Sequence, residues 1–176
     1  MICRVPEKGM HEMRKLYCGG RFHFDYLLEG YRDEAAKDYR SVLLGDTELL
    51  LQRSDNVWIH ENTEYIGPFY FETDGMQDRD IVQTEWEMVR NCTDAIFLLE
   101  TADCPGTVCE LTAAGMLGKN VHIFYLRDEG ETESLLRSPC WYPILHSVLI
   151  NERTSISECK NLDDAVEKIV SMVRKW

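Results

Sequence analysis

Ala95-Ile96-Phe97-Leu98-Leu99 is an unbroken apolar run of strand length, and it decides the fold class that we expect for this chain. A run without polar alternation is typical of a strand covered on both faces, as in a parallel sheet between two layers of helices. A second buried strand is expected at 120–126, and a helix that Gly118 ends is expected at 107–117 between the two. Strand, helix and strand in this order predict a parallel βαβ unit.

The same alternation continues outward from this unit. Toward the amino terminus we expect, in order, a strand at 15–18 stopped by two glycines, a helix at 24–44, a strand at 48–52, an irregular stretch at 53–76 and a helix at 77–92. Toward the carboxyl terminus we expect a short helix at 130–137, a last strand within 141–150 and an amphipathic helix at 162–173. The prediction is an α/β protein, a flavodoxin/Rossmann-like three-layer sandwich with a mostly parallel five-stranded sheet. Residues 1–176 are expected to form one domain, with 1–13 as a leader.

Composition restricts the partners that this chain can have. It carries 31 acidic against 19 basic residues, a net charge of −12, which repels nucleic acid and anionic membranes. A small nucleotide is still compatible, because it needs only a local anion site. No apolar run approaches the roughly 20 residues of a membrane helix, and the amino terminus has no secretory h-region.

Cysteine and histidine usage indicates the cell compartment. The seven cysteines form no Cys-x-x-Cys pair, and the five histidines show no ligand spacing. These features favour a reduced cytoplasmic protein without a structural metal.

In a sheet of this kind ligands bind beyond the carboxyl ends of the strands, which directs attention to two loops. The first loop follows the strand at 15–18. Gly19 and Gly20 permit positive φ and close approach of a ligand to the backbone, and Arg21 adds a planar cation suited to phosphate. The alternative is a tight turn with an exposed arginine.

The second loop runs from Asp103 into the helix expected at 107–117. Gly106 and Thr107 would lie at the helix amino terminus, where free N–H groups favour an anion. Glu110 would lie in the first turn and point toward the carboxyl end of the sheet. The alternative is a capping box, in which Glu110 only accepts a hydrogen bond from the Thr107 backbone N–H.

Further candidates lie outside these loops. Glu85 lies on the helix expected at 77–92, where an acid is usually just solvated. Asp94 directly precedes the central strand, a position more typical of a turn or cap residue than of a catalyst. Tyr65, Phe69 and Tyr70 could stack on a base or pack as a local hydrophobic cluster.

Together these pieces resemble the nucleoside 2-deoxyribosyltransferase family and its relatives that hydrolyse deoxynucleoside 5′-monophosphates. The first matching segment is the strand and turn Leu16-Tyr17-Cys18-Gly19-Gly20-Arg21. The second is the acidic helix from Glu85 that leads through Asp94 into the apolar strand. The third and most specific is Gly106-Thr107-Val108-Cys109-Glu110-Leu111, followed by Gly118-Lys119.

The resemblance implies a role for each matching residue. Glu110 corresponds to the nucleophile that attacks the anomeric carbon, and Tyr17 to the tyrosine that orients it. Gly19, Gly20 and Arg21 correspond to the turn that approaches the sugar 5′ end or its phosphate. The family acid on the preceding helix corresponds to Glu85 if one residue is inserted before Asp94.

The chain departs from the family pattern at one position. The aspartate that precedes Gly-Thr by two residues in the family is Cys104 here, with Asp103 one step upstream.

The resemblance also implies the reaction class. A carboxylate beneath the anomeric carbon stabilises an oxocarbenium-like state or captures it covalently, while a second acid protonates the leaving base. No metal or redox cofactor is needed, and the expected partner is a small nucleoside or nucleotide. A homodimer or larger homo-oligomer is implied as well. Transfer to another base and hydrolysis both remain open.

Three other interpretations compete with this one. A nucleoside-monophosphate phosphoribohydrolase shares the sheet and the Gly-Thr-x-x-Glu helix start, but has an additional Pro-Gly-Gly before it. A nucleotide-binding or sensor domain without turnover would fit the change at Cys104. A purely structural domain would hold nothing in its loops.

Overall fold

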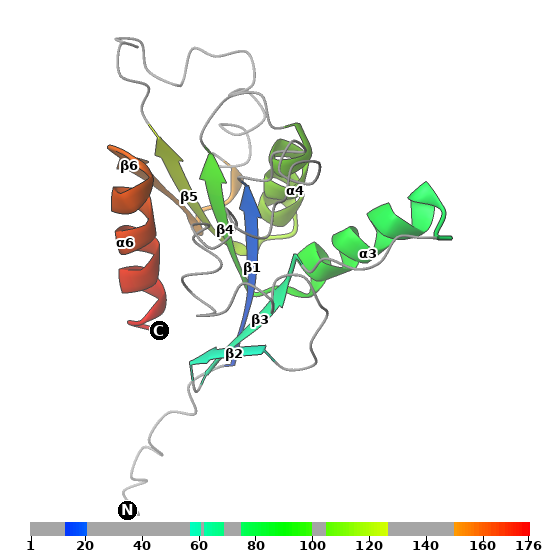
Figure 1. Cartoon of the computed structure of the whole chain (residues 1–176), viewed down its shortest axis with the longest axis horizontal. Coiled ribbons are helices and arrows are strands. Elements are labelled where there is room, and N and C mark those ends of the chain that lie inside the picture. Colours follow the sequence, from blue (N-terminus) through cyan, green and yellow to red (C-terminus); the bar gives the residue numbers. More distant parts are fainter. Residues whose placement is uncertain (1–12, 21–56, 61, 69–74, 100–104, 127–149) are drawn as a thin grey trace, which may run out of the picture.

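A six-stranded sheet forms the centre of the molecule (Figure 1). The computed structural model describes residues 13–20, 57–60, 62–68, 75–99, 105–126 and 150–176. The strands are β1 (Arg14–Gly20), β2 (Val57–His60), β3 (Thr63–Gly67), β4 (Asp94–Leu99), β5 (Asn120–Leu126) and β6 (Thr154–Cys159). The described helices are α3 (Asp78–Asn91), α4 (Pro105–Met116) and α6 (Leu162–Val173).

The sheet has the order β2-β3-β1-β4-β5-β6. The five strands from β3 to β6 are parallel, and β2 is added antiparallel at the edge, next to β3. The parallel strands therefore follow the order second, first, third, fourth and fifth along the chain, which is the flavodoxin-like order. The α/β fold with a mostly parallel sheet is confirmed, and β2 adds a sixth strand to the predicted five.

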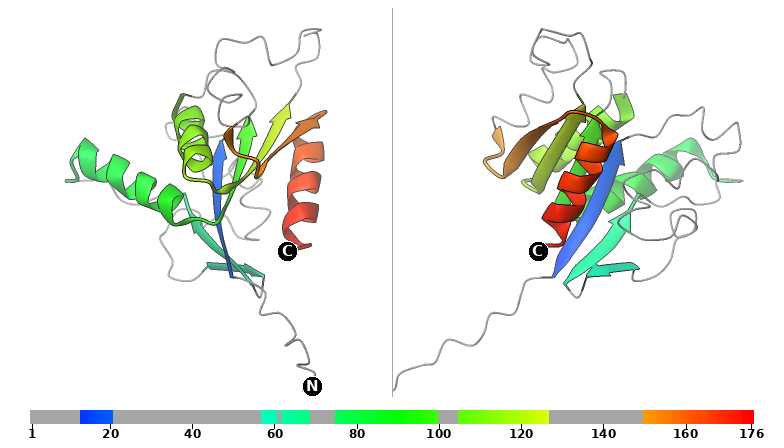
Figure 2. Two further views of the ribbon diagram at one scale, coloured as in Figure 1. Left: turned by 180° about the vertical axis from the view of Figure 1, so that it is seen from behind. Right: turned by 60° about the vertical axis from the view of Figure 1, so that its left-hand side comes forward.

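Helices cover the sheet on both faces, with α6 on one and α3 and α4 on the other (Figure 2). All six residues of β4 are buried, as the unbroken apolar run predicted. On α6 the buried residues Ala165, Ile169 and Val173 lie four apart and form one inward stripe. Asn161 caps this helix by accepting a hydrogen bond from the Asp164 backbone N–H. No helix in the described ranges is both long and apolar enough to span a membrane.

The sequence predictions fail mainly at polar strands. The stretch 53–76, predicted to be irregular, contains both β2 and β3. The structure also contains a strand that was not predicted, β6 at Thr154–Cys159. β6 is an edge strand with only Cys159 fully buried, so no apolar run marks it. The segments predicted at 24–44, 48–52, 130–137 and 141–149 lie outside the described residues.

The end of β1 and the start of α4 also differ from the predicted boundaries. Gly19 and Gly20 continue β1 instead of stopping it, and they pair with Phe97 and Leu98 of β4. Helix α4 begins at Pro105, two residues before the predicted start. Its predicted end is confirmed, because Gly118 follows the helix with φ of +68°.

Candidate active site

The carboxyl end of β1 lies against α4, where Gly19 is close to Glu110. A Cβ atom added to Gly19 would lie 2.6 Å from the Phe97 ring and 3.0 Å from Oε2 of Glu110. The missing side chain therefore leaves the space that the Glu110 carboxylate uses. At Gly20 a Cβ would lie 2.0 Å from the Leu98 carbonyl oxygen, and φ is +101°, so this glycine is required by the contact with β4.

Tyr17 reaches the same carboxylate from inside the sheet. Its side chain is fully buried on β1. Burial, followed by the charge of Glu110 and a hydrogen bond to it, raises the pKa of Tyr17 well above its usual value. The hydroxyl forms no hydrogen bond of standard geometry within the described chain, so its contact with Glu110 is looser than a standard bond. Contacts between catalytic groups are often long before a ligand binds.

The capping-box interpretation of Glu110 is wrong. Thr107 is the third residue of α4 and Glu110 the sixth, so Thr107 is already helical and cannot be the N-cap residue. Glu110 consequently lies in the second turn rather than the first. From this position it faces β1 and not the start of its own helix.

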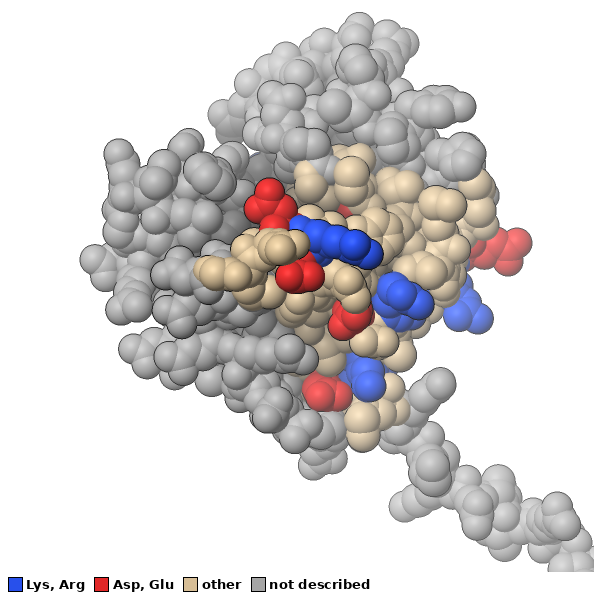
Figure 3. All heavy atoms as spheres, turned by 90° about the vertical axis from the view of Figure 1, so that its right-hand side faces the viewer, with Lys and Arg blue, Asp and Glu red and all other residues tan. Residues whose placement is uncertain are grey.

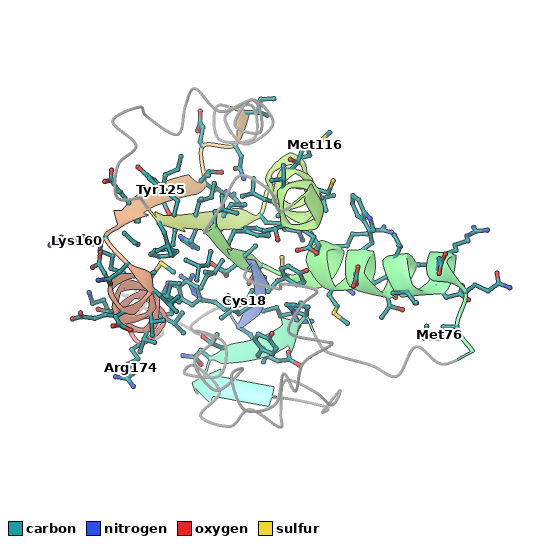
Figure 4. The ribbon with its side chains drawn as sticks, turned by 45° about the horizontal axis from the view of Figure 1, so that its top comes forward. Cys18, Met76, Met116, Tyr125, Lys160 and Arg174 are labelled. Carbon is teal, nitrogen blue, oxygen red and sulfur yellow. The ribbon has the colours of Figure 1, made fainter. Side chains whose placement is uncertain are left out.

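Glu110 also lines a pocket of about 170 Å³ between α3 and α4. The lining consists of Val82, Glu85, Trp86 and Val89 from α3 and Gly106, Cys109, Glu110 and Ala113 from α4. Each set has the spacing i, i+3, i+4, i+7, so each is one stripe of its helix. Figure 4 shows the two helices meeting beside the strand that carries Cys18. The pocket therefore brings Glu85 and Glu110, from separate segments, to one site.

The Glu85 side chain lies exposed at the edge of the pocket, and partial desolvation there raises the pKa of its carboxyl group. Within the described ranges its side chain has no hydrogen bond or ion pair with another residue. The charge of Glu85 contributes to the raised pKa of Tyr17, which places Tyr17, Glu85 and Glu110 in one electrostatic neighbourhood. A group whose pKa is raised by desolvation beside a pocket is typical of a proton donor.

Helix α3, which forms one wall of the pocket, projects away from the sheet (Figure 1). Acidic and basic side chains are interspersed over the described surface on that side (Figure 3). Two apolar side chains of the lining are exposed, Trp86 at 46% and Val82 at 50%. Trp86 and Cys109 were not predicted as lining residues of the pocket. Each is adjacent in sequence to a predicted glutamate, Glu85 or Glu110, and lies on the same helix stripe.

Other predicted site residues are placed in part. Gly106 is exposed at the mouth of the pocket, and Thr107 is partly buried in the first turn of α4. Tyr65 is 1% exposed, and its hydroxyl donates a hydrogen bond to the Pro68 carbonyl, so it packs in the core instead of facing a ligand. Arg21, Phe69, Tyr70, Asp103 and Cys104 lie outside the described residues.

Asp94 belongs to the opposite, amino edge of the sheet. Its carboxylate accepts hydrogen bonds from Arg14 at 2.8 Å, Thr93 at 2.7 Å and Asn120 at 3.1 Å. Burial acts to raise the pKa of Asp94, but the nearby His122 ring, the hydrogen bond from Thr93 and the charge of Arg14 lower it below its usual value. The carboxylate is thus held ionised as a structural group, in agreement with the sequence interpretation.

The remaining groups that could react or bind a metal ion are the cysteine thiols and the clusters of possible metal ligands. Cys92, Cys109 and Cys159 are thiols that form no disulfide. Burial raises the pKa of Cys92 to about 11, so this thiol is unreactive at neutral pH. Among the described residues, no three His, Cys, Asp or Glu side chains cluster closely enough to hold a metal ion.

Comparison with known proteins adds a likeness in fold. No protein-family model matches the sequence, and no curated protein matches it. Among solved structures, the chain is similar to the CMP N-glycosidase BcmB of Clostridium botulinum, with a TM-score of 0.52 and 12% sequence identity. The likeness covers 90% of this chain and 99% of that protein. At this identity it establishes a common fold over nearly the whole of both chains.

Proposed function

We propose that the chain cleaves the N-glycosidic bond of a nucleoside or nucleoside 5′-monophosphate. The observation that carries the proposal is the convergence of Glu110, Tyr17 and Glu85 around the pocket between α3 and α4. Two carboxylates and an orienting hydroxyl are the groups that glycosidic cleavage requires. Similarity in fold to a protein named as a CMP N-glycosidase supports the same reaction class.

In the proposed reaction, the ionised Glu110 attacks the anomeric carbon of the sugar. The bond from this carbon to the base nitrogen breaks, and the nitrogen takes a proton from Glu85. An ester then links Glu110 to the sugar. The raised pKa of Glu85 keeps the acid protonated to a higher pH than usual. Tyr17 holds the carboxylate in the attacking orientation, which is a positioning role.

The ester is resolved by water or by a second base. In both cases the bond from Glu110 to the anomeric carbon breaks. Water attacks this carbon to give the free sugar and returns a proton to Glu85. A second base attacks through a ring nitrogen, gives the proton of that nitrogen to Glu85 and forms a new nucleoside. Asp103 is proposed to contact the base or the sugar, and Gly19, Gly20 and Arg21 to accept a 5′-phosphate. Gly106 and Thr107 would contribute backbone N–H groups at the start of α4. We also propose a homo-oligomer, on the resemblance alone.

The test is chromatography of a mixed pool of nucleosides and 5′-monophosphates incubated with the protein. We expect free bases from the wild type and a loss of roughly 10³-fold or more in the Glu110→Gln variant, beyond the effect of losing a single stabilising donor. Circular dichroism checks that the variant is folded. Unchanged base release by a folded Glu110→Gln protein would refute the nucleophile assignment.

The same assay separates the remaining alternatives. New nucleosides formed after a second base is added indicate transfer, and free sugar alone indicates hydrolysis. Preference for the 5′-monophosphate that disappears in Arg21→Ala supports the phosphate contact. Binding of a nucleotide without base release would favour the nucleotide-binding domain that the change at Cys104 suggests.

A further inference from the structure

A second and larger pocket lies at the amino edge of the sheet, opposite Glu110. Its volume is about 370 Å³, more than twice that of the pocket between α3 and α4. The lining consists of Met13, Arg14, Cys92, Thr93, Asp94, Leu117, Gly118, Lys119, Asn120, Arg153 and Trp176. Pockets that hold small molecules have volumes of about 300–1,000 Å³, so this one has the size of a small organic ligand.

The charge of this pocket is opposite to that of the chain. Among the described lining residues, Arg14, Lys119 and Arg153 supply three positive side chains, and Asp94 is the one acidic side chain. Asp94 already has Arg14, Thr93 and Asn120 as donors, so it does not neutralise the other cations. The excess of positive charge stands out in a protein whose net charge is −12.

Hydrogen bonds and a ring contact hold the backbone of Lys119 and Arg153 and the side chain of Arg14 in place. One buried amide, Asn151, donates from Nδ2 to the Lys119 carbonyl at 2.7 Å and accepts at Oδ1 from the Arg153 backbone N–H at 3.1 Å. The Asn151 side chain thus joins the two backbone segments that carry Lys119 and Arg153. Arg14 is fixed by Asp94 on one side and by the Trp176 ring on the other, with its guanidinium 4.6 Å from the ring centroid.

These cations keep donors for a ligand. Within the described chain the Arg153 guanidinium has no hydrogen-bond or ion-pair partner. Lys119 uses one donor, from Nζ to the Arg90 carbonyl at 2.7 Å, and no described carboxylate pairs with it. The Arg14 side chain is still 36% exposed. Guanidinium and ammonium groups that line one pocket match the oxyanion of a phosphate.

Part of the wall is apolar. Met13, Leu117 and Trp176 complete the lining beside the cations. We infer that this pocket is a second binding site, for a small organic phosphate with an apolar or planar body. It is independent of the proposed glycosidase reaction, because none of its residues lines the pocket of Glu110.

The test is isothermal titration with phenyl phosphate, which has a ring and a phosphate but no glycosidic bond. We expect Arg153→Gln to bind it about tenfold more weakly or worse, as loss of one charge-assisted hydrogen bond predicts. Because the Arg153 side chain is exposed, the variant should fold normally. The matched control is Arg79→Gln, an exposed arginine on α3 outside the pocket, with wild-type affinity expected.

Two further measurements make the result specific. Glu110→Gln should bind phenyl phosphate as tightly as the wild type, because Glu110 lies at the other edge. Inorganic phosphate should bind more weakly than phenyl phosphate, because it cannot use the apolar wall. The inference is overturned if the wild type does not bind phenyl phosphate at millimolar concentration, if Arg153→Gln and Arg79→Gln bind it equally, or if Glu110→Gln abolishes binding. Equal affinity for the two phosphates would overturn the assignment of an apolar body.

Discussion

The carboxyl groups at the two edges of the sheet have pKa values that are shifted in opposite directions. At the amino edge, Asp94 is surrounded by donors, and its pKa is lowered. At the carboxyl edge, Glu85 borders an open pocket, and partial desolvation raises its pKa. Tyr17 there faces two carboxylates and no described cation, and its pKa is raised as well. A satisfied buried charge stabilises the fold, whereas a carboxyl group with a raised pKa beside a pocket is suited to chemistry.

The strongest test of this contrast is Glu85→Gln. We expect base release to fall by roughly 10²–10⁴-fold, the usual contribution of a positioned general acid. Because the acid must be protonated, wild-type turnover should decline as pH rises through the raised pKa of Glu85, and the variant should lose this limb. The measurement is the pH profile of kcat/KM. Glu87→Gln, exposed on the same helix, is the control, and equal turnover by the two variants would rule out the acid role.

Tyr17→Phe tests whether the hydroxyl positions Glu110 or contacts substrate. We expect kcat to fall by roughly 10- to 100-fold with KM little changed, because a displaced carboxylate loses its attacking geometry. Steady-state kinetics separates the two parameters. Tyr125→Phe is the matched control, since its hydroxyl donates to Glu158 on the distant strand β6. A rise in KM equal to the loss in kcat/KM would make Tyr17 a ligand contact.

Gly19→Ala tests whether the space over β1 belongs to the Glu110 carboxylate. The new methyl group would meet the Phe97 ring and Oε2 of Glu110, so we expect a loss of about 1–3 kcal/mol of stability together with lower turnover. Gly106→Ala meets nothing within 4 Å in α4 and should be neutral or stabilising by up to about 1 kcal/mol. Urea denaturation measures both. Equal stability of the two variants would contradict the close contact.

Asp94→Asn should affect stability and leave chemistry alone. We expect a loss of roughly 1–2 kcal/mol at neutral pH, because charge-assisted hydrogen bonds at the amino edge are weakened. Turnover per folded molecule should not change. The folded pKa of Asp94 is lowered, so its contribution is present above the unfolded pKa of about 4 and is lost as pH falls through the folded value.

Urea denaturation at a series of pH values checks this dependence. Wild type and Asp94→Asn should converge in stability at acidic pH, while the exposed control Asp163→Asn should follow the wild type throughout. Reduced turnover in folded Asp94→Asn would instead connect the amino edge to the reaction.

Segments with strong apolar patterns were predictable, and those without were not. The central strand and β5 follow from short unbroken apolar runs, and α6 follows from a stripe of apolar residues with helical spacing. β6 carries the sequence Thr154-Ser155-Ile156-Ser157-Glu158-Cys159, in which hydrogen bonding to β5 rather than apolar burial selects the strand. The capping-box alternative arose for a similar reason, because Thr-x-x-Glu has the same spacing whether the helix begins at Thr107 or two residues earlier.

The sequence by itself determined the layers of this protein and the residue types available for chemistry, since burial of apolar runs requires a covered parallel sheet. The tertiary structure decided which of those residues meet. Glu85 lies on α3 and Glu110 on α4, and strand β4 separates these helices in the chain. The packing of α3 on α4 turns the stripe of each helix that carries its glutamate toward a single pocket. Tyr17 joins them because β1 inserts between β3 and β4. Such contacts depend on strand order and helix rotation, which are properties of the whole sheet and not of any local spacing.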